Sequence, residues 1–195
     1  MDVSHEPDRS DRAGLVWVRS MGGPLIVVPE SSVNAWGGCT EDGSVVGDAG
    51  GRDDYDRACE VEDLAGLITV GASGATALVL ADEPAKTSFL PKELMFVRWL
   101  AADSEDELFE GVEAVLADPD TEWEDSGLWV TDGPAVLMDS AEAGADLGVE
   151  YPDGGHPDQT LVQLPAGRWR VRAAHKTGEF PWVGVVQLVA ESGRD

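Results

Sequence analysis

Lysine and cysteine are both scarce in this chain of 195 residues, which contains three Lys and two Cys. Two cysteines are too few to cross-link a small secreted fold, and neither Cys39 nor Cys59 stands in the paired spacing of a zinc site. We expect two reduced, partly buried thiols, as is usual in a reducing compartment. The cysteines therefore predict neither a disulfide framework nor a metal ion.

Long apolar runs are lacking too. No stretch of the sequence approaches the roughly 18 uninterrupted apolar residues of a membrane span, and residues 1–14 have no apolar segment like that of a secretory signal. We expect these 14 residues to form a mobile tail and the protein to be cytoplasmic. With 43% hydrophobic residues and seven Trp, the rest of the chain can form a globular core.

Motifs for catalysis or cofactor binding are also missing from the sequence. No serine stands in GxSxG, no glycine pair belongs to a phosphate-binding motif, and no spacing singles out a glycosidase pair among the acids. The alternating acids from Asp118 to Glu124 resemble a calcium loop, but Trp123 occupies the position that requires glycine. We therefore expect a protein that is not an enzyme and has no catalytic residue, cofactor or metal.

Acidic residues dominate what is present. The 38 Asp and Glu outnumber 13 Lys and Arg, for a formal charge of −25. Residues 161–195 hold five basic and three acidic residues, a balance of +2, which leaves −27 for residues 1–160. Such a surface repels nucleic acid and anionic membranes and attracts basic macromolecules. Two explanations stay open: an acidic face for a basic partner, or a uniformly acidic surface that serves solubility, as in salt-adapted proteins.

One segment has the pattern of an amphipathic helix, from about residue 104 to 117. Ser104 and Glu107 have the spacing of a capping box, and acids fill the first turn. Apolar residues recur with helical spacing along one stripe from Leu108 to Leu116, and Pro119 ends the pattern. This is the clearest helix that the sequence predicts.

Most other apolar runs predict short strands. Residues 15–28 predict two strands around a turn or one bulged strand, and residues 67–70 and 77–80 predict a hairpin. Residues 87–90 are expected to be irregular. Further strands are expected at 95–100, 127–130, 135–138, 161–164, 168–174 and 182–189.

The order of these elements predicts an α+β fold of mostly antiparallel sheets with one amphipathic helix and a strand-rich C-terminal half. We expect an N-terminal α+β lobe at 15–118 and a mainly antiparallel β lobe at 119–195, or one continuous domain.

Three arginines alternate with apolar residues in the predicted strand 168–174. Arg168, Arg170 and Arg172 would share one face of it, where they could bind a phosphate or carboxylate. The alternative is that they pair with carboxylates on adjacent strands or are simply solvated on the sheet surface. An anion-binding module or enzyme that uses these arginines is thus our second functional hypothesis.

Five of the seven tryptophans, Trp182 among them, fall in apolar runs and are expected in the core. Trp36 and Trp123 are flanked by turn or acidic residues instead. An exposed Trp rimmed by carboxylates would be a good anchor for a protein partner.

Several short motifs resemble the immunity protein 21 family of bacterial toxin-immunity systems. The resemblance extends from Trp17 to Trp99. It is carried by Trp17, residues 22–26 with Pro29, residues 36–38, residues 54–59, residues 78–84 with Thr87, and Arg98-Trp99. It implies an α+β protein that protects its producer by binding a toxin made for use against neighbouring bacteria. It implies no catalytic residues.

The charge pattern fits that role, since toxins that cut nucleic acid are usually basic and carboxylates can mask them. We expect the contacts in two acidic clusters, with Trp36 or Trp123 as anchors. The candidate residues are Asp53, Asp54, Asp56 and Trp36, and Asp120, Glu122, Trp123, Glu124 and Asp125.

Overall fold

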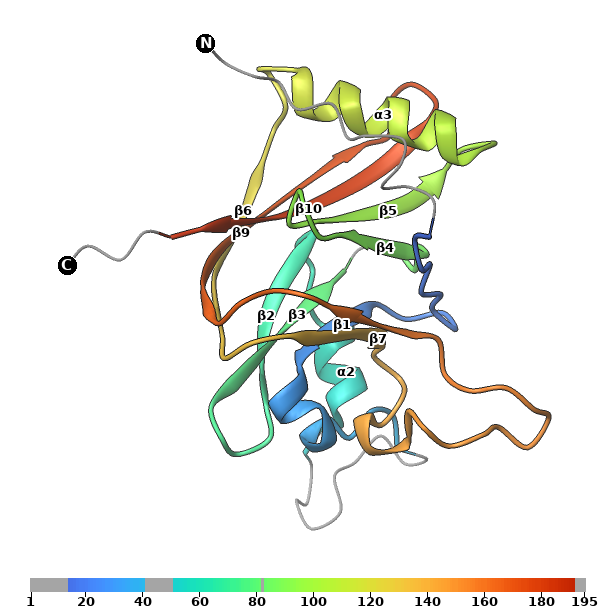
Figure 1. Cartoon of the computed structure of the whole chain (residues 1–195), viewed down its shortest axis with the longest axis vertical. Helices are drawn as coiled ribbons and strands as arrows, with labels where there is room; N and C mark the ends of the chain where they lie inside the picture. Colours follow the sequence, from blue (N-terminus) through green and yellow to red (C-terminus); the bar gives the residue numbers. More distant parts are fainter. Residues whose placement is uncertain (1–13, 41–50, 82, 192–195) are drawn as a thin grey trace.

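The computed structural model describes residues 14–40, 51–81 and 83–191 (Figure 1). Within these ranges ten strands form two five-stranded antiparallel sheets. The first sheet has the order β2-β3-β1-β7-β8, from β1 (Leu25–Pro29), β2 (Ala65–Val70), β3 (Ala75–Leu80), β7 (Ala135–Asp139) and β8 (Gln159–Val162). The second has the order β4-β5-β10-β9-β6, from β4 (Thr87–Leu90), β5 (Met95–Ala101), β6 (Glu124–Thr131), β9 (Gly167–Lys176) and β10 (Trp182–Ala190). The helices are η1 (Glu30–Ala35), α2 (Asp54–Cys59), α3 (Glu105–Ala117) and η2 (Gly144–Asp146).

The main core lies between the two sheets. It contains Leu25 and Val27 of β1 together with Trp129 of β6 and Trp169 of β9, all buried. The intervening β1 residues belong to a second core on the other face of the first sheet, beneath η1 and α2. Because both faces of β1 are buried, its sequence is continuously apolar instead of alternating.

Helix α3 covers the outer face of the second sheet. Its buried residues Leu108, Phe109 and Val112 pack in a third core with Val183 and Val185 of β10. Figure 1 shows α3 at one end of the stack and α2 at the other. The layers therefore run helix, sheet, sheet, helix, which confirms the α+β class and the single long amphipathic helix.

The predicted helix begins and ends almost where the sequence indicated. The Ser104 hydroxyl accepts a hydrogen bond from the Glu107 backbone N–H at 3.2 Å. The Glu107 carboxylate accepts from the Asp103 N–H at 2.7 Å, one residue earlier than in the capping-box pattern. At the far end Leu116 is 39% exposed, so the buried stripe stops at Val115.

Two secondary-structure predictions in the first half of the chain were wrong. Only Leu25–Pro29 forms a strand within residues 15–28. Val18 instead makes a single antiparallel bridge to Thr87. Residues 87–90, expected to be irregular, form the fully buried strand β4, which pairs with β5. The Val18 bridge depends on a partner distant in sequence, which local propensity does not encode, whereas β4 forms a hairpin with the next strand, β5.

Each sheet takes strands from both sides of residue 118. Strands β1, β2 and β3 share one sheet with β7 and β8 through the pairing of β1 with β7, and β4 and β5 share the other with β6, β9 and β10. The division into lobes at 15–118 and 119–195, or their union in one domain, stays a prediction. Most of the expected N-terminal tail lies outside the described residues.

Candidate functional site

The first acidic cluster surrounds the start of α2. Asp53 is 1% exposed and is the N-cap of that helix: its carboxylate accepts from the Asp56 N–H at 2.8 Å. It also accepts from the Thr40 N–H at 2.8 Å and from the Thr40 hydroxyl at 3.1 Å. Burial raises the pKa of Asp53, but the hydrogen bonds from Thr40 and Asp56 outweigh it and lower the pKa below its usual value. This carboxylate holds two chain segments together and is not part of the outer surface.

Asp54 and Asp56, next to this cap, are half-buried. Asp54 accepts from the Gly37 N–H at 2.8 Å and from the Arg57 guanidinium at 2.6 Å. Arg57 in turn donates to the Thr69 carbonyl of β2 at 2.6 Å. Asp54 therefore links α2 to the segment after η1 and, through Arg57, to the first sheet.

Trp36, the aromatic candidate of this cluster, is 1% exposed. Its indole N–H donates to the Ser140 carbonyl at 3.0 Å, and its ring belongs to the core under the first sheet. The expectation of an exposed anchor here was wrong. The flanking glycines reflect close backbone packing, since a Cβ on Gly38 would lie 2.5 Å from the Ala141 carbonyl oxygen.

The second acidic cluster follows α3 and is more exposed. Asp120 and Glu122 are exposed, as is Asp118 before them. The Asp118 carboxylate accepts from the Asp120 N–H at 2.9 Å, a local turn contact. The segment lies in a long stretch, residues 99–167, that contains 18 Asp and Glu and no Lys or Arg.

The remaining candidates of this cluster are tied to strands. Glu124 is half-buried and accepts from the Leu64 N–H at 2.8 Å. Asp125 is exposed, and its pKa is lowered by the Gly127 N–H and the Arg170 guanidinium, which donates at 2.8 Å. Trp123 is half-buried, with the Arg172 guanidinium carbon 4.2 Å from its ring centre.

The three arginines of β9 lie on one face of the strand, as predicted, while Trp169 and Val171 face the core. Arg170 donates to Asp125 and, at 3.1 Å, to Glu191, and Arg168 contacts Glu191 at 3.4 Å. Arg172 donates to the Gln187 side-chain amide oxygen, Oε1, at 2.9 and 2.6 Å. Arg168 and Arg170 thus pair with carboxylates of β6 and of the residue after β10, the arrangement that we set against an anion site, whereas Arg172 pairs with a neutral amide oxygen.

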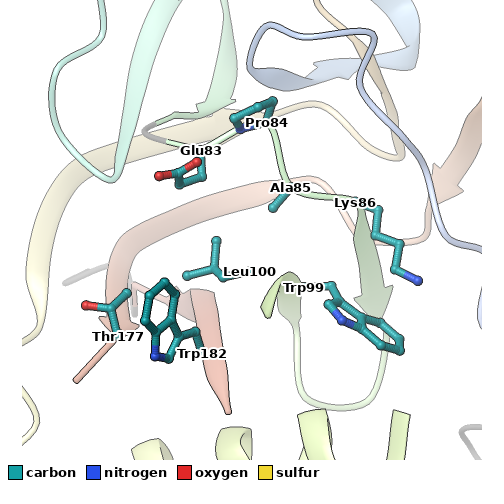
Figure 2. Close-up of a pocket in the computed structure, with 8 residues that line it drawn as sticks. All are labelled: Glu83, Pro84, Ala85, Lys86, Trp99, Leu100, Thr177 and Trp182. Atoms are coloured by element: carbon teal, nitrogen blue, oxygen red, sulfur yellow. The ribbon is translucent and has the colours of Figure 1, made fainter. Parts of the chain in front are cut away.

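Two clefts lie on either side of residues 177–181, the loop between β9 and β10, hereafter the hairpin loop. One cleft, of about 590 Å³, is drawn in Figure 2 and is called the aromatic cleft. Its lining residues are Glu83, Pro84, Ala85, Lys86, Trp99, Leu100, Thr177 and Trp182. The other, of about 580 Å³, is called the acidic cleft. Its lining residues are Ala114, Val115, Asp118, Asp120, Thr121, Glu122, His175, Lys176, Thr177, Gly178 and Glu179.

A buried arginine shapes the aromatic cleft. Arg98 on β5 is fully buried, and its guanidinium donates to the carbonyls of Ala81 and Glu83 in the connection between β3 and β4. This fixes the Glu83–Pro84 side of the cleft against the second sheet. At the opposite side the Lys86 ammonium nitrogen, Nζ, lies 3.5 Å from the ring centre of Trp99. The Trp99 indole packs edge-on against Trp17, with 5.4 Å between the two ring centres.

Sequence reasoning missed the exposure of Trp182. Its strand is apolar, so we placed it in the core, but its side chain is 43% exposed at the edge of the aromatic cleft. Phe180, two residues earlier, is 51% exposed. A local signal exists: Gly178-Glu179-Phe180-Pro181 is a turn sequence, so Trp182 stands at the very start of its strand.

The described part of the chain has few features of a catalytic centre. It holds no group of three or more His, Cys, Asp or Glu placed to share a metal ion. Cys39 and Cys59 are free thiols and both are exposed, so the expectation of partial burial was wrong. None of the described helices combines the length and the hydrophobicity needed to cross a bilayer. The geometry offers surfaces and clefts for binding.

Comparison with known proteins gives one match. A family model described as immunity protein 21 matches residues 16–179, well beyond the range of the motifs identified above. Searches of curated proteins and of solved structures gave no significant match.

Proposed function

Because this chain belongs to the immunity protein 21 family, we propose that it protects the bacterium that makes it by binding and inhibiting a cognate toxin. The family match over residues 16–179 carries the proposal. Inhibition by binding requires no catalysis, so the protein is not an enzyme. It acts in the cytoplasm, where it binds toxin made by the same cell or toxin that has entered from a neighbouring cell.

The formal charge of −25 supports a basic toxin. Opposite charge speeds the encounter of two proteins and disfavours wrong partners. Toxins that act on nucleic acid carry positive charge for that purpose, so a carboxylate-rich inhibitor can cover the same surface that the toxin uses on its substrate. The arginine face offers no comparable support for an anion-binding function, because Arg168 and Arg170 are paired with carboxylates and Arg172 with the Gln187 amide oxygen.

The exposed acids after α3 are better placed for such a partner than those at α2. Asp118, Asp120 and Glu122 are exposed, whereas Asp53 and Asp54 are engaged by backbone N–H groups. Carboxylates already held inside the fold have less to gain from a new cation. We therefore place the acidic contact surface at residues 118–122.

A charge-reversal experiment tests this function. The probe is the toxin domain that we expect the reading frame beside this gene to encode, purified in an inactivated form. Changing Asp118, Asp120 and Glu122 to Lys should slow association about tenfold or more at low salt and much less at high salt. Stopped-flow association rates and survival of toxin-expressing cells are the readouts.

The matched control carries the same change in net charge elsewhere. Glu150, Asp153 and Asp158 are exposed in the connection between β7 and β8, and their triple Lys variant should bind almost like the wild type. Equal slowing in both triple variants would show that total charge, and not residues 118–122, guides association. A wild-type protein that neither binds the toxin domain nor protects the cell would refute the function itself.

A further inference from the structure

We propose that the hairpin loop, with the aromatic and acidic clefts beside it, is the surface that contacts the toxin. The occupant is a basic segment of that polypeptide, with an apolar side chain in the aromatic cleft and a Lys or Arg in the acidic cleft. The inference rests on the function proposed above and adds the site and the chemistry of recognition.

Exposed aromatic side chains gather at the hairpin loop. In the described ranges three large aromatic residues are clearly exposed: Tyr151 at 39%, Phe180 at 51% and Trp182 at 43%. Two of them stand two residues apart on the hairpin loop and at the start of β10. Large aromatics are enriched among the residues that dominate binding energy, and leaving two in water is costly unless a partner covers them.

The backbone places Trp182 at the rim of a concave site. In the pairing of β5 with β10, Trp182 is opposite Ala101 and Val183 is opposite Trp99, which leaves Leu100 as an extra residue. Such a bulge redirects side chains at the end of a strand. Figure 2 shows Leu100 between the indoles of Trp182 and Trp99, with Glu83 and Pro84 across the cleft.

The acidic cleft adds charge on the other side of the same loop. Asp118, Asp120, Glu122 and Glu179 line it, and Lys176 is the one basic residue of its lining apart from His175. Both clefts include Thr177, so they meet at the hairpin loop. An aromatic anchor bordered by carboxylates suits a basic partner, because apolar contacts supply affinity while the charges guide the encounter.

The hairpin loop packs against helix α3. Pro181 and Val183 lie so close to α3 that a Cβ on Gly111 would be 3.0 Å from Pro181 Cγ and 2.8 Å from Val183 Cγ1. Val183 is fully buried and pairs with Lys176 across the hairpin. A pre-formed loop loses less conformational freedom when it binds, so more of the contact energy remains as affinity.

Charge decides between a basic protein and a second copy of this chain as occupant. Two identical molecules, each with a formal charge of −25, would bring the acidic clefts of both copies to one interface. Like charges at an interface oppose association. A basic polypeptide is the occupant whose charge complements the cleft.

The experiment measures the purified, inactivated toxin domain encoded beside the gene against three full-length proteins: wild type, F180S/W182S and the control Y151S/L161S. The control removes an aromatic and an aliphatic side chain of similar exposure, 39% and 44%, on and before β8 of the first sheet, whereas the hairpin loop belongs to the second sheet. We expect F180S/W182S to raise the Kd about 30-fold or more, mainly through faster dissociation and at all salt concentrations. The control should change the Kd less than about threefold.

Hydrogen exchange of the wild-type complex gives a second reading that needs no variant. Amides in residues 176–183 and 118–122 should become protected when the toxin domain binds. Tight binding with no protection there, or an unchanged Kd for F180S/W182S with circular dichroism like that of the wild type, would overturn this inference and leave the immunity function standing. Absence of wild-type binding would refute the function and the site together.

Discussion

The two acidic clusters are both rich in Asp and Glu, but their most exposed and most buried carboxylates differ in how far the fold engages them. At α2 the carboxylates of Asp53 and Asp54 are bound to backbone N–H groups and lie within the fold. After α3 the carboxylates of Asp120 and Glu122 are exposed beside a cleft. A run of acids therefore has two distinct uses, to cap and join chain segments or to present charge, and only the surrounding contacts distinguish them.

The largest effect expected from this comparison is on stability at Asp53. Replacing Asp53 with Ala removes the N-cap of α2 and leaves the Thr40 N–H and hydroxyl without their acceptor. We expect a loss of about 2–3 kcal/mol in the free energy of unfolding, measured by urea denaturation. A loss below about 0.5 kcal/mol would mean that the cap is not important for stability.

The pH dependence of stability gives a second test of the Asp53 cap. The pKa of Asp53 is lower in the folded protein than its unfolded value of about 3.9. Its contribution to stability is therefore fully present above that unfolded value and is lost as the pH falls through the folded pKa. The difference in unfolding free energy between wild type and D53N should be constant from pH 5 to about 7 and shrink in more acidic solution. A difference that grows on acidification would contradict this.

A smaller loss is expected at Asp54. The D54A variant loses the acceptor of the Gly37 N–H and the partner of Arg57, and about 1 kcal/mol of stability is expected to go with them. The D54N variant keeps an oxygen for the Gly37 N–H and should retain part of that stability. Thermal and urea denaturation of both variants would test this order.

The smallest effect on stability is expected in the second cluster. Asp120 is exposed, and its replacement by Ala should change the free energy of unfolding by less than about 0.5 kcal/mol. The same substitution should slow association with the toxin domain at low salt, which D54A should hardly affect. If D120A instead destabilised the fold as much as D53A, the contrast between the clusters would fail.

The tryptophans show how far local sequence predicts burial. Trp129 and Trp169 lie in apolar strands and are buried as expected. Trp36 and Trp182 exchange their expected roles: the one among glycines is buried, and the one in an apolar strand is exposed. Burial depends on which segments cover a residue, and those segments come from elsewhere in the chain, as the Ser140 carbonyl does for Trp36.

The candidate site shows the same limit. The arginine face and its paired carboxylates were predictable from strand alternation and from the excess of acids. The two clefts were not, because each combines segments that are distant in the sequence, such as residues 83–86 with Thr177 and Trp182. The bulge at Leu100 likewise depends on the register between β5 and β10.

The acidic balance, the helix from Glu105 to Ala117, most strands and the family were predictable from the amino-acid sequence. These follow from composition, from periodicity and from short motifs, all of which are local. The order of strands in the two sheets, the carboxylates that join distant segments, and the aromatic side chains that are exposed became known only from the folded structure. Those outcomes depend on contacts between residues distant in sequence, because strands pair and side chains become buried only when the two sheets assemble.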